Sequence, residues 1–194
     1  MGRSINNRRL KTPNITLIGE GITEQYYFKH IRSIFDFRYI LRPYYFGITS
    51  IGNMDRKIEE VIEGGGIAIC VFDTDVSLRS EVEKKKLNGL LKKYGRSKNV
   101  ILCNSLPSVE YWFLLHYENT NRHFNSSKLV ERALRRYMPK YKKSMLFLEK
   151  EKWVMDLCAD HKLDTANQRA KNFSDDSPSY SNIFRAFDLF IKRV

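Results

Sequence analysis

The chain has 194 residues, of which 42% are hydrophobic and 13% aromatic, enough to build one packed domain or one domain with a small appendage. Disordered chains are poor in aromatic residues, so this composition excludes disorder as the default state. The net charge of +12 is the usual electrostatic signature of a nucleic-acid-binding protein, and a basic surface that only aids solubility is the alternative.

Membrane, secretory and disulfide-rich proteins do not fit the sequence. The longest apolar runs, residues 67–72 and 111–115, are far shorter than the roughly 20 residues of a membrane-spanning helix. Residues 1–11 are polar and basic and contain no apolar segment of a secretory signal. Cys70 and Cys103 lie in apolar runs and no Cys-x-x-Cys pair is present, which favours reduced thiols. We therefore expect a cytoplasmic protein with no membrane contact.

The first half of the chain alternates between strand and helix patterns. Short apolar runs predict strands, at residues 14–18, 39–46, 67–72 and 100–103. Apolar residues at helical spacing predict helices between them, at residues 23–34, 51–62 and 87–94. Strand–helix alternation of this kind predicts an α/β fold whose mainly parallel sheet has helices on both faces.

The second half of the chain is predicted to be helical. Apolar spacing predicts helices, at residues 130–137, 153–157 and 183–191, with a loop at residues 173–179. We expect residues 12–118 to form the α/β domain and residues 119–194 to form a C-terminal helical extension packed on it. The first of these helices carries a basic face that Lys140, Lys142 and Lys143 extend, formed by Lys128, Arg132, Arg135 and Arg136. This face is either a nucleic-acid-binding surface or simply a solvated one.

Acidic residues follow three of the predicted strands. Glu20 comes after the first strand, Asp73 and Asp75 directly after the buried strand, and Glu110 after the last one. Ligand-binding groups in parallel sheets gather beyond the carboxyl ends of the strands, so we expect these side chains to lie near one another. Carboxylates one residue apart repel each other unless a cation separates them, and oxygen ligands suit Mg²⁺ or Mn²⁺.

Each of these acids also has an ordinary structural interpretation. Asp73 and Asp75 are compatible with a solvated turn, and Glu20 with a surface turn. Glu24 would add a carboxylate to the site, or it would only stabilise the first turn of its helix. If Ser108 is an N-cap, Glu110 has the same early-turn role, although its place at the predicted active edge favours function. The four histidines have no metal-ligand spacing.

Three segments of the chain, taken together, resemble the RloB-like family. They read Glu-Gly-Ile-Thr-Glu-Gln-Tyr-Tyr-Phe at residues 20–28, Val-Phe-Asp-Thr-Asp at 71–75 and Ser-Val-Glu-Tyr-Trp-Phe-Leu-Leu-His at 108–116. Ala166, Ala170 and residues 178–182 extend the resemblance to roughly residues 14–192. That family is similar to Toprim proteins, whose signature is a Glu after the first strand and Asp-x-Asp after a later one.

The resemblance implies a Toprim-type, Mg²⁺-dependent nuclease that cleaves phosphodiester bonds, with Mn²⁺ as a substitute ion. Asp73 and Asp75 would hold the metal and Glu20 would be a further ligand or the general acid/base. Glu24 or Glu110 would be needed for a second ion, and Ser105 or Ser108 would complete the Ser/Glu element. The resemblance also implies an effector of anti-phage defence by abortive infection.

The resemblance further implies partners and leaves competing functions open. The expected partners are nucleic acid, either DNA or RNA, and an AAA-type ATPase, and a homodimer is a further option. One alternative is a non-catalytic nucleic-acid-binding or regulatory subunit of such an ATPase complex. Another is a nucleotidyl transferase or primase-like enzyme, which the absence of an obvious template-handling domain disfavours.

Overall fold

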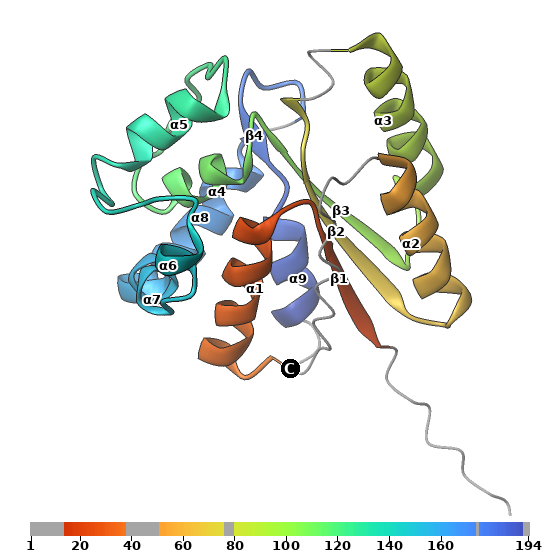
Figure 1. The fold of residues 1–194 in the computed structure, drawn as a ribbon, viewed down its shortest axis with the longest axis horizontal. Coiled ribbons are helices and arrows are strands. Elements are labelled where there is room, and N and C mark those ends of the chain that lie inside the picture. The colour runs from red at the N-terminus through yellow and green to blue at the C-terminus, as the bar shows by residue number, and fades with distance from the viewer. Residues whose placement is uncertain (1–13, 38–50, 76–79, 174, 192–194) are drawn as a thin grey trace, which may run out of the picture.

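A four-stranded sheet lies at the centre of the computed structural model, which describes residues 14–37, 51–75, 80–173 and 175–191 (Figure 1). The strands follow the order β1 (Ile15–Gly19), β2 (Ile67–Asp73), β3 (Val100–Leu106) and β4 (Tyr180–Ser181). The first three are parallel, and β4 runs antiparallel to β3. The α/β prediction is therefore confirmed. The predicted strand at residues 39–46 lies outside the described residues.

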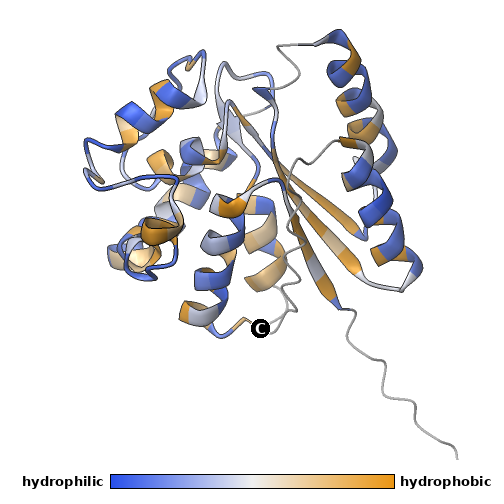
Figure 2. Ribbon diagram, viewed as in Figure 1, coloured by the Kyte–Doolittle hydropathy of each residue, from blue (hydrophilic) through white to orange (hydrophobic). Residues whose placement is uncertain are grey.

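The parallel strands are buried on both faces because helices cover each side of the sheet (Figure 1). Alternate residues of one face, such as Ile18, Cys70 and Leu102, pack in a core with helices α2 (Ile51–Glu63) and α3 (Glu81–Tyr94). The opposite face packs with helices that come from both halves of the chain, α1 (Ile22–Phe35), α4 (Val109–Leu115) and α9 (Phe184–Ile191). Figure 2 shows the resulting pattern, with hydrophobic strands inside and hydrophilic outer faces on α2 and α3.

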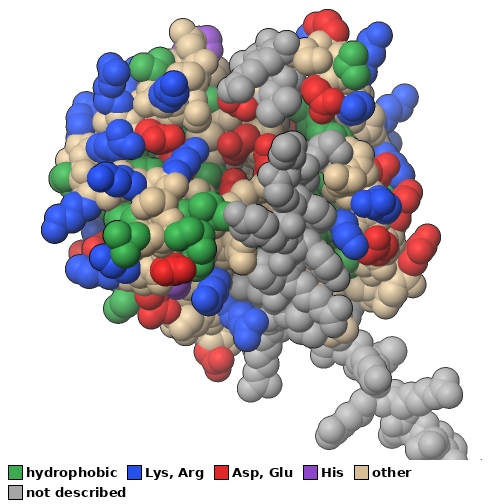
Figure 3. All heavy atoms as spheres, in the orientation of Figure 1, with side chains coloured by type: hydrophobic (Ala, Val, Ile, Leu, Met, Phe, Trp, Pro, Cys, Tyr) green, Lys and Arg blue, Asp and Glu red, His purple; other side chains and the backbone are tan. Residues whose placement is uncertain are grey.

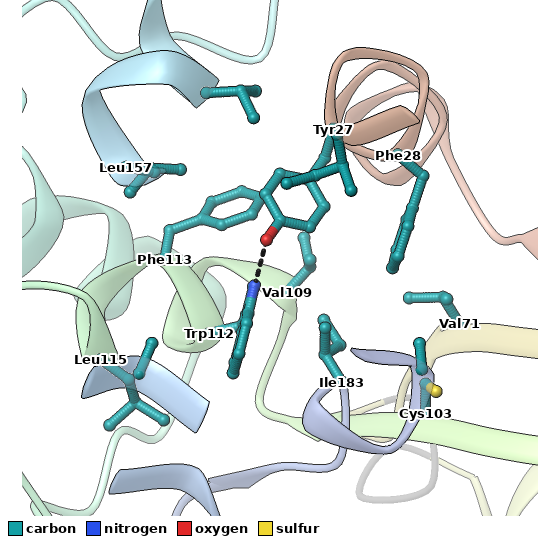
Figure 4. Close-up of a cluster of buried hydrophobic side chains, with 14 of the residues drawn as sticks. Tyr27, Phe28, Val71, Cys103, Val109, Trp112, Phe113, Leu115, Leu157 and Ile183 are labelled. Carbon is teal, nitrogen blue, oxygen red and sulfur yellow. Dashed lines mark hydrogen bonds between the residues drawn. The ribbon is translucent and has the colours of Figure 1, made fainter. Parts of the chain in front are cut away.

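The larger core joins the sheet to the helices of the second half. The indole N–H of Trp112 donates a hydrogen bond of 2.8 Å to the Tyr27 hydroxyl (Figure 4). Trp112 also stacks on Phe187 of α9, with 5.7 Å between ring centroids. Tyr27 of α1 and Trp112 of α4 are both fully buried. Truncation of either aromatic side chain to alanine is therefore expected to lower the free energy of unfolding by about 3–5 kcal/mol.

The second half is largely helical, as predicted, with one strand that the sequence did not predict. Its helices are α5 (Ser127–Leu134), α6 (Met145–Leu148), α7 (Lys152–Cys158), the 3₁₀ helix η2 (Ala159–His161) and α8 (Lys162–Lys171). The predicted helix over residues 130–137 ends early, at Leu134, and Tyr137 is 42% exposed instead of lying on the apolar face. The strand β4 is held to β3 partly by a 2.8 Å hydrogen bond between the hydroxyls of Ser105 and Ser181.

The helices of the described residues are all too short or too polar to cross a membrane.

Candidate functional site

Glu20 links the ends of the first two strands. It follows β1, and its backbone N–H donates to the carbonyl of Val71 over 3.1 Å. Its carboxylate oxygen Oε2 accepts a 2.9 Å hydrogen bond from the backbone N–H of Asp73. The side chain of Glu20 therefore lies across the end of β2, beside Asp73, as the strand-end argument predicted.

Asp73 is the last residue of β2 and faces the start of α4. Its Oδ1 accepts a 2.9 Å hydrogen bond from the backbone N–H of Val109, the first residue of that helix. Thr74 then fixes the chain as it leaves the sheet, because its backbone N–H and its hydroxyl both donate to the carbonyl of Ser105, over 2.9 and 3.0 Å. The end of β2 is thus held rigidly against both neighbouring elements.

Glu110 is completely buried and is held by three side chains. Ser108 and Tyr141 donate hydroxyl hydrogen bonds of 2.7 Å to its two carboxylate oxygens, and the Lys143 ammonium lies 3.0 Å from Oε1. Ser108 occupies the N-cap position of α4, but its side chain makes no capping hydrogen bond because the hydroxyl is directed to Glu110. The expected N-cap role is therefore replaced by a contact within the site.

Glu24 lies in the first turn of α1 and is almost fully buried over the loop that holds Glu20. A Cβ atom on Gly21 would lie 3.1 Å from its Oε2, and one on Gly19 would lie 3.4 Å from its Cβ. The space that Glu24 takes thus explains Gly21, since a side chain there would push the carboxylate aside, whereas the contact at Gly19 is an ordinary van der Waals one.

Burial and mutual repulsion raise the pKa values of the acids at this edge. For Asp73, burial is the largest cause and the carboxylates of Glu24, Glu110 and Glu20 add to it, so its pKa is well above the ordinary range. Burial, with Glu110 and Glu20 nearby, raises the pKa of Glu24 to about 7. Burial also raises the pKa of Glu20, and the charge of Asp75 contributes. Lys143 opposes these shifts but does not cancel them.

These residues form one group, which we call the strand-end carboxylates and define as Glu20, Glu24, Asp73, Asp75 and Glu110. Asp75 is half-buried in the turn after β2 and belongs to the group through its electrostatic effect on Glu20. Figure 3 shows acidic side chains gathered in the middle of this face of the molecule. The structure therefore brings together all five acids that the sequence singled out.

The chemistry of this group fits a divalent cation. Several carboxylates face one ammonium, and hard oxygen ligands are those that Mg²⁺ and Mn²⁺ prefer. Within the described residues, no three acidic, histidine or cysteine side chains already surround a common metal position. Metal binding would therefore require these carboxylates to move closer to a common point than they are here. Glu20 and Asp73 each accept a backbone N–H with one oxygen, and the other oxygen of each, Oε1 of Glu20 and Oδ2 of Asp73, could serve as a ligand.

Two residues of the site were not predicted. Lys143 was expected to extend the basic face, but its ammonium lies 3.0 Å from Glu110 and 3.4 Å from Glu131. Tyr141 approaches Glu110 from the same segment after α5. No sequence pattern indicates that either residue contacts Glu110, because each lies more than 30 residues from it along the chain.

The predicted basic face is split by the end of α5. Lys128 and Arg132 are exposed and have no ion pair with a described residue. Arg135 and Arg136 follow the helix and pair with acids of the same surface, Glu131 at 3.2 Å and Glu118 at 3.1 Å. Of the two serines considered, Ser108 contacts the site acid Glu110, whereas Ser105 lies inside β3.

No curated protein and no solved structure matches the chain. The sequence model described as RloB-like protein matches residues 15–193, which is nearly the whole chain and includes every strand-end carboxylate. The chain therefore belongs to the RloB-like family.

Proposed function

We propose that the protein is a divalent-metal-dependent nuclease of the Toprim type, with its active site at the strand-end carboxylates. The observation that carries the proposal is the gathering of five acids at the carboxyl ends of β1 and β2 and the start of α4, where Lys143 is the one opposing ammonium among the described residues. Structural carboxylates are normally paired one to one, so an uncompensated group in a buried position supports a functional role.

Asp73 and Asp75 would hold Mg²⁺ or Mn²⁺, with Glu20 and Glu110 as further ligands. A bound divalent ion polarises a phosphodiester and stabilises the negative charge that develops on its oxygens. Burial raises the pKa of Glu20, and the side chain is only partly buried, so its carboxyl group is suited to exchange a proton with a substrate at this edge. Lys143 balances part of the negative charge through its 3.0 Å ion pair with the buried Glu110 carboxylate.

The resemblance to the RloB-like family supports a role in anti-phage defence together with an AAA-type ATPase. The net charge of +12 supports nucleic acid as the substrate, since a basic surface attracts phosphate backbones. The basic face of Lys128, Arg132, Arg135 and Arg136 would contribute to this attraction, most directly through Lys128 and Arg132, which are exposed and have no ion pair with a described residue.

The test is a cleavage assay on labelled duplex DNA, single-stranded DNA and tRNA, with Mg²⁺, with Mn²⁺ and with EDTA. We expect cleavage of at least one substrate class with a divalent ion and none with EDTA. The assay is repeated with the ATPase encoded beside the gene, where one exists. Nucleic-acid binding without cleavage in every arm would contradict the proposal and favour a non-catalytic subunit.

A further inference from the structure

A second candidate site lies in a pocket of about 1060 Å³ beside α6 and α7. It is bounded by the segment after α5 and by the start of α8, and it includes Tyr141. Ligand pockets of proteins usually measure roughly 300–1,000 Å³, so this one has room for more than a single small group. Figure 3 shows hydrophobic side chains between basic ones on this side of the molecule, over α6.

Aromatic rings form much of the pocket lining. Tyr117 and Tyr137 are nearly parallel, with 4° between the ring planes and 5.1 Å between centroids. Phe147 and Trp153 line the same pocket with centroids 6.0 Å apart. Tyr137 lies outside the core and is 42% exposed, so part of this aromatic surface is open to a ligand.

The charge of the pocket is strongly positive. Its lining includes two aspartates and five lysines, Lys140, Lys142, Lys150, Lys152 and Lys162. Lys152 pairs with Asp156 at 2.9 Å and Lys162 approaches Asp160 at 3.7 Å. The other three lysines form no ion pair with any residue that the structure describes, and all three are exposed. They are therefore available to an anionic ligand.

One short segment connects this pocket to the strand-end carboxylates. Lys140 and Lys142 line the pocket, while the next residue, Lys143, reaches Glu110. Tyr141 takes part in both, because it is one of the lining residues of the pocket and its hydroxyl donates to Glu110. A ligand in the pocket would thus contact the same short segment that holds Glu110.

We propose that the pocket binds nucleotide units, with bases against the aromatic lining and phosphates at Lys140, Lys142 and Lys150. Bases stack on exposed aromatic rings without sequence preference, and unpaired lysines bind phosphate. This inference rests on the proposed function, because the pocket would hold part of the nucleic-acid substrate of the proposed nuclease. The same chemistry is offered by a single strand and by a free nucleotide.

The test is fluorescence anisotropy with a labelled oligothymidylate of about 12 nucleotides, long enough for a single-strand site. It is run in EDTA, so that failure of cleavage and failure of pocket binding are distinguishable. Tyr137→Leu is expected to weaken binding by roughly 5- to 150-fold through lost stacking. Tyr137→Phe keeps the ring and is expected to bind as the unaltered protein does.

The charge contribution is tested with Lys140→Gln/Lys142→Gln. Loss of two phosphate contacts is expected to make the log–log salt slope shallower by about 1.4 units on a single strand. The matched control is Lys85→Gln/Lys92→Gln, which removes the same charge from exposed lysines of α3 on the other side of the sheet. If the pocket variant and the control lower affinity equally, the proposal is wrong.

Competition with thymidine monophosphate separates the two sources of the ligand. Binding of the oligonucleotide at concentrations where the mononucleotide does not compete assigns the pocket to a nucleic-acid strand. Equal affinity for both assigns it to a free nucleotide. Absence of binding by either, or unchanged binding by Tyr137→Leu, would overturn the proposal even if the protein cleaves nucleic acid.

Discussion

Two groups of acids on the molecule have opposite electrostatic settings. On α2, Asp55 and Glu59 face α3, where the Lys93 ammonium lies 2.9 and 2.6 Å from them and the Tyr94 hydroxyl donates to Asp55 over 2.6 Å. Burial of Asp55 acts against its ionisation, but the hydrogen bonds from Tyr94 and Lys93 outweigh it and lower its pKa.

The strand-end carboxylates show the reverse behaviour. Burial and neighbouring carboxylates raise the pKa values of Glu20, Glu24 and Asp73, and Lys143 offsets only part of the repulsion. The α2–α3 acids thus behave as a surface ion-pair network, whereas the strand-end group stores repulsion that folding alone would not favour. The comparison separates acids that stabilise the fold from acids whose mutual repulsion works against it.

The largest expected effect is on catalysis. Asp73→Asn and Glu20→Gln should each lower the cleavage rate by more than about 100-fold, since loss even of groups around a metal typically costs 10- to 100-fold. Both variants keep an oxygen that accepts the present hydrogen bond and remove a repulsive charge, so their melting temperatures should stay equal or rise.

Asp55→Asn is the control for these variants, because it neutralises an acid of the α2–α3 network. It should leave the cleavage rate unchanged and lower the melting temperature. Full cleavage by Asp73→Asn would exclude the strand-end carboxylates as the active site. Single-turnover rates and calorimetric melting of all three proteins provide the comparison.

The second largest effect concerns Lys143, the cation that pairs with Glu110. Lys143→Met leaves Glu110 buried without its ion pair, and breaking a buried pair costs about 3–5 kcal/mol. The Lys143 side chain is 37% exposed, so solvent screening reduces the expected loss to about 2 kcal/mol.

Added Mg²⁺ should restore much of this stability if the carboxylates bind it, because a ligand of the folded state raises the free energy of unfolding. Lys93→Met should be less damaging and should not respond to Mg²⁺. Urea unfolding with and without the ion measures both. A Lys143→Met protein that Mg²⁺ fails to stabilise would argue against a metal site.

A smaller effect is expected on the pH dependence of stability. In the folded protein the pKa of Glu24 is about 7, whereas in the unfolded chain it has the ordinary value of 4.5. The stabilising contribution is therefore complete below about pH 4.5 and is lost as the pH rises towards 7. Glu24→Gln should flatten this part of the profile.

Urea midpoints measured between about pH 4.5 and 8 test this expectation. Asp55→Asn is the control and should leave the slope in this window unchanged, because the stability linked to the lowered pKa of Asp55 is lost only in more acidic solution. Identical slopes for the unaltered protein and Glu24→Gln would show that Glu24 is ionised in the folded state across this range.

The smallest effect comes from the loop that carries Glu20. A Cβ on Gly21 would lie 3.1 Å from the Glu24 carboxylate, so Gly21→Ala should shift that carboxylate by a few tenths of an ångström and reduce cleavage several-fold. Gly89→Ala on α3 meets no neighbour within 4 Å and should instead stabilise the protein by about 0.5–1 kcal/mol. Equal cleavage rates in the two variants would remove Glu24 from the site.

The sequence predicted the parallel strands and most helices because their patterns are local. Residues 67–72 of β2 are a continuous apolar run. Asp73 and Asp75 come directly after this run, so they lie at the edge of the sheet where the parallel strands end. β4 was missed because two residues carry no periodicity, and its pairing with β3 depends on contacts such as the Ser105–Ser181 hydrogen bond. The α5 helix was predicted too long because Tyr137 continued its spacing while stacking elsewhere.

The acids of the candidate site could be predicted from the sequence, but the cation and the hydroxyl that contact them could not. Glu20, Asp73 and Glu110 follow strands in the sequence, so topology alone brings them together. Lys143 and Tyr141 reach Glu110 from a segment without regular structure, whose path depends on tertiary packing. Their contribution could be found only from the coordinates.

The antiparallel strand β4 and helix α9 have a consequence for the rate of folding. The ring of Phe28 in α1 stacks on Phe187 in α9 with 6.3 Å between centroids, so the core joins residues from near the two ends of the described chain. Contacts of such long sequence separation must pay a large loop-closure entropy before they stabilise anything, which slows folding. We therefore expect the sheet edge at β3 to be among the last parts of the protein to become protected from hydrogen exchange during refolding.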